Sequence, residues 1–118
     1  MGNTVVHDSQ LNGHYTHDYH LMMEMDDDEL FDVCQTNHFA KQVCDSDNFW
    51  HVRINTYLYN NFPFMFLYHG DYKKIYQHLL YHRYDIVLKI IYAHASDDAI
   101  DDFEDWLDNH PEFYITHA

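Results

Sequence analysis

The sequence has few of the residues from which catalytic loops and nucleic-acid-binding surfaces are built. Its three glycines form neither a phosphate-binding loop nor a nucleophile elbow. Six Lys and Arg stand against twenty Asp and Glu, which gives a formal charge of −14. Such a surface repels a phosphate backbone and an anionic membrane leaflet alike. The composition therefore argues against an enzyme, a direct nucleic-acid binder and a membrane-bound protein.

Long apolar runs are missing too, since no stretch approaches the roughly 18 residues that a membrane-spanning helix needs. The N-terminus has neither the basic start nor the apolar stretch of a secretory signal. There are two cysteines, Cys34 and Cys44, and their spacing fits neither a redox pair nor a zinc site. We therefore expect two buried, reduced thiols in an intracellular protein of the cytoplasm or nucleus.

Aromatic residues and histidines are abundant. Phe, Trp and Tyr make up 18% of the chain, which predicts a folded protein rather than a disordered one. A length of 118 residues is typical of one domain. Protonating all twelve histidines would cancel most of the net negative charge. We therefore expect this acidic, histidine-rich chain to self-associate or precipitate as the pH falls toward about 5.

The N-terminal half changes character at Asp18. Residues 1–17 are polar and lack an apolar period, which favours a flexible arm. Residues 18–25 predict a short apolar helix. Asp26 and Glu29 have the spacing of a capping box and open a second amphipathic helix. The acidic turn that follows Cys44 caps a third short helix.

The C-terminal half is predicted to be helical as well. Pro63 interrupts any helix in the aromatic stretch 57–70. Apolar residues then recur with helical spacing from residue 71 onward, and Ser96 is expected to cap the last helix. The β-branched residues of 86–94 also suit a strand, but their spacing favours a buried helix. The sequence thus predicts an all-α fold.

Three runs follow one another in a recognisable order: Leu21–Leu30, Val33–Phe39 and Val43–Ile54. They contain a first apolar helix, an acidic turn, a second helix, a hydrophobic-Cys pair, another acidic turn and a Phe-Trp pair followed by a basic and an aliphatic residue. This combination resembles an F-box. It is especially similar to F-box-like proteins of large DNA viruses, in which a Phe-Pro segment (here 61–63) and a Tyr-rich helix (here 72–76) follow.

The resemblance implies a three-helix module at 18–55 that packs with a helical extension, 56–118, as one compact unit. It further implies an adaptor that docks a Skp-type subunit of a cullin ubiquitin ligase and presents a client. A viral source would place the protein in the host cytoplasm or the virion. One departure is the missing Leu-Pro start, because residues 15–18 read Tyr-Thr-His-Asp.

Three short helices bury too little apolar surface to be stable alone, so part of that surface is expected to meet a partner. The partner-binding candidates are Leu21, Met22, Met25, Leu30, Val33, Phe39 and Trp50. The flexible thioethers of Met22 and Met25 suit an adaptable interface. Large apolar residues are usually internal, so the alternative for Val33 and Trp50 is a place in the core.

Two other functions remain open: a structural or assembly subunit of a virus particle or another large complex, and an acid-rich binder of basic proteins. His14, His17 and His20 recur every third residue beside Asp18, a spacing that also suits a zinc or copper site. Their segment has weak helical character, so we expect no native metal site and no cofactor. The sequence leaves the oligomeric state open.

Overall fold

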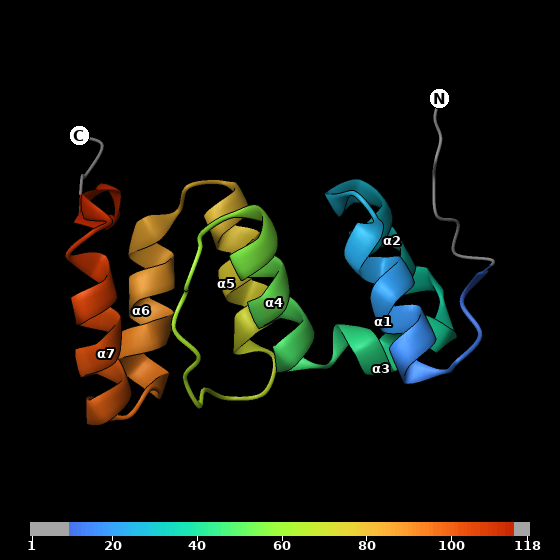
Figure 1. Ribbon diagram of the computed structural model, residues 1–118, viewed down its shortest axis with the longest axis horizontal. Helices are drawn as coiled ribbons and strands as arrows, with labels where there is room; N and C mark the ends of the chain where they lie inside the picture. The colour runs from blue at the N-terminus through green and yellow to red at the C-terminus, as the bar shows by residue number, and fades with distance from the viewer. Residues whose placement is uncertain (1–9, 115–118) are drawn as a thin grey trace. The chain divides into compact units, whose positions relative to one another are not determined.

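The computed structural model describes residues 10–114, and within this range it contains seven α-helices and no strand (Figure 1). The predicted all-α class is thereby confirmed. The chain divides into two compact units, Met1–Phe49 and Trp50–Ala118. The sequence predicted one compact unit whose module ended at residue 55. The division instead falls within a helix, α4 (Asp47–Tyr57).

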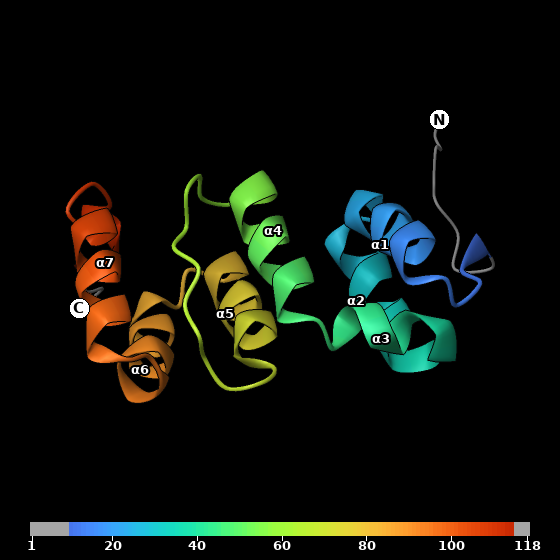
Figure 2. The ribbon, with the colours of Figure 1, turned by 60° about the horizontal axis from the view of Figure 1, so that its bottom comes forward.

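The first unit is built from short helices joined by tight turns. It contains α1 (Tyr15–Glu24), α2 (Asp27–Thr36), the 3₁₀ turn η2 (His38–Ala40) and α3 (Lys41–Cys44). Figures 1 and 2 both show α1 and α2 side by side. The buried apolar side chains of α1, α2, η2 and α3 are Met22, Leu30, Val33, Ala40, Val43 and Cys44.

Side-chain caps fix where α2 and η2 begin. The Asp26 carboxylate accepts a hydrogen bond of 2.8 Å from the Glu29 amide, which confirms the predicted cap. Asn37 ends α2, and its side chain accepts 2.9 Å from the amide of Phe39. The chain therefore reverses direction sharply at residues 37–40.

The segment before α1 is not a flexible arm where the structure describes it. Leu11 is buried, and the buried Asp18 carboxylate accepts from the amides of Asn12 (3.1 Å) and Gly13 (2.8 Å). Helix α1 already begins at Tyr15. The prediction of a flexible arm is therefore wrong for residues 10–17, because a buried carboxylate anchors their backbone. Residues 1–9 of that predicted arm lie outside the described range.

The second unit contains the rest of α4 and three further helices of 10 or 11 residues. These are α5 (Asp71–Leu80), α6 (Tyr84–His94) and α7 (Asp97–Leu107), followed by the 3₁₀ turn η3 (Pro111–Tyr114). Both ribbon views show α4 beside α5 and α6 beside α7. The 84–94 stretch is helical, as its apolar spacing predicted, and Ser96 caps α7 by accepting from the Ala99 amide.

Between α4 and α5 the chain runs as a long extended segment, which Figure 1 shows in green to yellow. Phe62 anchors it by packing on Phe103 and Trp106 of α7, with ring centroids 5.9 and 5.1 Å apart. Among the described residues, no helix is long and apolar enough to cross a membrane.

Candidate protein-interaction site

Five of the seven predicted partner-binding residues lie in the core. Met22, Met25, Leu30, Val33 and Trp50 are buried, so in this conformation they stabilise the fold and cannot touch a partner. This corrects the sequence prediction for Met22, Met25 and Leu30, and it confirms the alternative of a core position for Val33 and Trp50. Helical spacing identifies an apolar face, but it does not say which neighbouring element covers that face.

The two remaining candidates stay accessible. Leu21 is half-buried, whereas the Phe39 side chain is 38% exposed. Phe39 lies in η2 between His38 and Ala40. Ala40 is buried, and the ring centroids of His38 and Phe39 are 4.1 Å apart. The turn that Asn37 caps thus directs Phe39 outward.

A disulfide bond joins Cys34 of α2 to Cys44 of α3. The prediction of two reduced thiols is therefore wrong. The reversal at residues 37–40 brings the two Cα atoms within 5.9 Å, although ten positions separate them in sequence. Disulfides form and persist in oxidising surroundings, so the cysteines no longer favour a reducing compartment. The bond closes a loop, residues 35–43, that carries Phe39.

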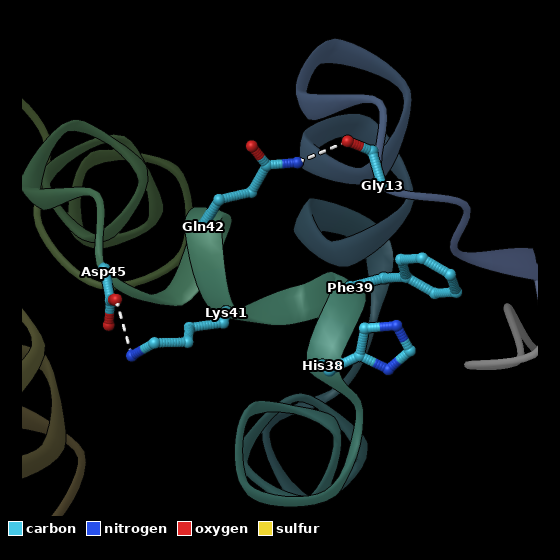
Figure 3. A pocket seen from close by; sticks show the side chains of 6 residues that line it. All are labelled: Gly13, His38, Phe39, Lys41, Gln42 and Asp45. Carbon is cyan, nitrogen blue, oxygen red and sulfur yellow. Dashed lines mark hydrogen bonds and ion pairs between the residues drawn. The ribbon is translucent and has the colours of Figure 1, made fainter.

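An open pocket of about 430 Å³ lies beside Phe39. Figure 3 shows the six side chains and backbone positions that line it. These are Gly13, His38, Phe39, Lys41, Gln42 and Asp45. Four of them belong to the loop that the disulfide closes. The bond therefore braces most of the pocket wall.

Polar contacts fix the rim of this pocket. The Gln42 side-chain amide donates 2.6 Å to the Gly13 carbonyl, and Lys41 pairs with Asp45 at 3.0 Å (Figure 3). Lys41 is exposed, so this ion pair contributes little to stability. The pocket lining thus combines polar groups with the rings of His38 and Phe39, which suits an apolar side chain of another protein.

Gly13 lies close against the Phe39 ring. Its φ is +90°, and a Cβ added there would lie 3.1 Å from Cδ1 of Phe39. The left-handed conformation and the short distance both favour glycine at this position. Asp18 holds it in place through the hydrogen bond from the Gly13 amide.

The Asp18 carboxyl combines burial with several donors. Burial acts to raise its pKa, but hydrogen bonds from His17 and from the amides of Asn12 and Gly13 outweigh it and lower the pKa below 3.8. His17 lies 2.9 Å from the carboxylate. Asp18 is therefore ionised at neutral pH and acts as a structural anchor for one wall of the pocket.

Residues 10–114 contain no group of three or more His, Cys, Asp or Glu placed to hold a metal ion. Of the histidines singled out in the sequence, His17 pairs with Asp18, His20 lies against the Tyr19 ring, and His14 precedes α1.

Comparisons with protein-family models, with curated proteins and with solved structures give no match to this chain.

Proposed function

We propose that this chain is a non-catalytic protein-interaction adaptor of the F-box-like kind. It docks a Skp-type subunit of a cullin ubiquitin ligase through the surface around Phe39, and the second unit presents a client. One observation carries the proposal: an exposed aromatic residue lies beside an open pocket, on a loop that is fixed at both ends by a disulfide.

A pre-formed surface of this kind suits recognition of a partner. Phe39 does not have to be ordered on binding, because Asn37, Ala40 and the disulfide already hold its turn. Aromatic residues in such positions often carry most of the binding energy of an interface. The pocket beside the ring would accept an apolar side chain of the partner.

The charge of the first unit narrows the choice of partner. Residues 1–49 contain ten Asp and Glu but a single Lys or Arg, Lys41. A partner surface that is basic or neutral around an apolar centre would complement it. An acidic surface would be repelled.

Co-purification from host cells tests this proposal. We expect the wild-type chain to recover a Skp-type subunit together with a cullin, and Phe39→Asp to recover neither. Tyr81→Asp is the matched control, because Tyr81 is 72% exposed on the other unit and its substitution should leave recovery unchanged. Equal recovery by both variants, or none by the wild type, would contradict the proposal.

The disulfide favours a second candidate function. Disulfides are rare where thiols are kept reduced, as they are in the cytosol, and common on virion surfaces. A structural or assembly subunit of a virus particle would retain the Cys34–Cys44 bond and bury its acidic surface against basic partners. Recovery of particle proteins alone, with the cysteines oxidised in the particle, would favour this role over the adaptor.

A further inference from the structure

The extended segment of residues 62–68 presents a row of aromatic side chains. Phe62 and Met65 point into the core and are buried. Phe64, Phe66 and Tyr68 are 51%, 88% and 65% exposed. Successive outward residues at every second position are typical of a strand, although the segment pairs with no strand in the described part of the chain.

Hydrogen bonds hold this segment in its extended form. At one end, Asn55 accepts 2.6 Å from the Phe62 amide, and His51 lies 2.6 Å from the Phe62 carbonyl. In the middle, the Tyr72 hydroxyl bonds to both the amide and the carbonyl of Met65. At the other end, Asp71 accepts 3.1 Å from the amide of residue 68. These bonds therefore hold the segment in its extended form without a partner.

Its outer peptide groups are available for pairing. Within residues 10–114, the amides of Phe64 and Phe66 donate to no protein group. An extended segment with unpaired amides is a template to which a second extended chain adds as a strand. Pairing would supply affinity through the backbone and selectivity through alternate side chains.

Phe64 and Phe66 contact each other, and Tyr68 packs on a separate ring. Phe64 lies 5.6 Å from Phe66, and it packs on His51 at 5.1 Å and on Tyr72 at 5.8 Å. Tyr68 packs on His94 at 4.3 Å. Exposed aromatics gathered in this way mark interaction sites more often than isolated ones do.

Acidic residues are concentrated on α7, the helix on which Phe62 of the segment packs. Trp106 packs on Phe62, and Asp102 lies one helical turn earlier on the same side of α7. The acidic residues of α7, all exposed, are Asp97, Asp98, Asp101, Asp102, Glu104 and Asp105. The segment is thus anchored at Phe62 on a helix whose exposed residues are largely acidic, and this charge favours a cationic ligand.

We propose that residues 62–68 bind an extended basic peptide of a client protein, in which apolar residues alternate with Lys or Arg. The peptide pairs with the backbone at Phe64 and Phe66, lays its apolar side chains against the aromatic row and directs its cations to α7. This deepens the proposed adaptor function, because it assigns the client a place and a chemistry. A second copy of this chain fits less well, since each copy carries a charge of −14.

Fluorescence anisotropy with the full chain and a labelled peptide of about six residues, the usual length of a strand, tests the proposal. The probe alternates Lys with Val. One control alternates Glu with Val. The other control, the blocked peptide, has the composition of the probe but carries its Lys residues together at one end and its Val residues at the other. We expect saturable binding of the alternating Lys-Val peptide alone. Equal binding of the Glu-Val peptide or of the blocked peptide would overturn the proposal.

Variants then locate the site. Phe66→Ser should weaken binding at least about tenfold, as loss of a central aromatic does at other interfaces. Tyr81→Ser, which changes another highly exposed aromatic at the far end of α5, should leave binding unchanged. The double change Asp102→Asn and Asp105→Asn should weaken binding and flatten its dependence on salt. No effect of Phe66→Ser, or an equal effect of Tyr81→Ser, would refute the assignment.

Two further measurements show whether the segment pairs with a peptide or with a second copy of this chain. A comparison with Skp-type binding then separates this site from the proposed adaptor function. Hydrogen exchange should show the amides of Phe64 and Phe66 protected by the peptide; unprotected amides would contradict strand pairing. Sedimentation should show a monomer without peptide, and a dimer that Phe66→Ser abolishes would assign the segment to a second copy instead. Peptide binding that persists when no Skp-type subunit binds would refute the adaptor function and leave this site standing.

Discussion

His94 at the end of α6 forms a hydrogen bond with the carboxylate of Asp71 at the start of α5, with Nδ1 2.5 Å from Oδ2, although 23 residues separate them in sequence. The same carboxylate oxygen accepts from the amide of Tyr68, whose ring packs on His94. The pair therefore joins two helices and fixes the end of the extended aromatic segment.

Removing this contact should destabilise the second unit. We expect His94→Ala to lower the free energy of unfolding by about 2 kcal/mol, because a nearly buried carboxylate loses a hydrogen bond. His69→Ala, an exposed histidine nearby in sequence, is the control and should change stability little. Urea denaturation followed by Trp fluorescence measures both. Equal stability of the two variants would show that the contact is not structural.

Reducing the disulfide should loosen the loop that carries Phe39. The chain-entropy model gives a bond that closes so short a loop about 3 kcal/mol of stabilisation. We expect faster hydrogen exchange across residues 27–44 in the presence of a thiol reductant. The double variant Cys34→Ser and Cys44→Ser should exchange at that faster rate with or without reductant. Identical exchange in the oxidised and reduced wild type would contradict the bracing role of the bond.

Gly13 and Gly70 allow the pocket wall to be tested with a matched pair. Both have a positive φ, +90° and +91°, so alanine at either should cost about 1–2 kcal/mol of stability. At Gly13 the new Cβ also meets the Phe39 ring, whereas at Gly70 nothing lies within 4 Å. Thermal unfolding and partner binding, measured for both variants, should therefore distinguish the two substitutions. Gly13→Ala alone should weaken binding at Phe39, and equal binding by both would argue against the pocket.

Acid should weaken the first unit through Asp18. Because the pKa of this carboxyl is lower in the folded protein than in the unfolded chain, its stabilisation is complete above about pH 5 and is lost as the pH falls through the folded value, below 3.8. We expect Asp18→Asn to be less stable at pH 7 and less sensitive to acid. Asp32→Asn, an exposed carboxylate, is the control. Circular dichroism melts across this pH range measure the difference, and parallel curves for wild type and Asp18→Asn would contradict the prediction.

Local rules predicted the helices and their starts well. Asp26 and Ser96 cap helices as their side chains and spacing indicated, and Pro63 lies in a non-helical segment. These outcomes depend on residues within one turn of each other. The helical rather than strand conformation of 84–94 likewise follows from the spacing of its apolar residues.

Long-range contacts decided the features that the sequence did not reveal. The Cys34–Cys44 bond depends on a reversal at η2, and the position of residues 10–14 depends on a carboxylate in α1. The burial of Met22 and Met25 likewise depends on neighbouring elements. The sequence did contain one signal for the disulfide. Asn37 lies between the two cysteines, and as a capping residue it ends α2 and turns the chain back.

The most direct test of the adaptor function is isothermal titration of the oxidised chain with a purified Skp-type subunit. We expect saturable binding that Phe39→Ala weakens about 30-fold, the effect of losing an anchor worth about 2 kcal/mol. Tyr81→Ala should bind as tightly as the wild type. Absence of binding by the wild-type chain, or equal affinity of Phe39→Ala, would contradict the proposed function.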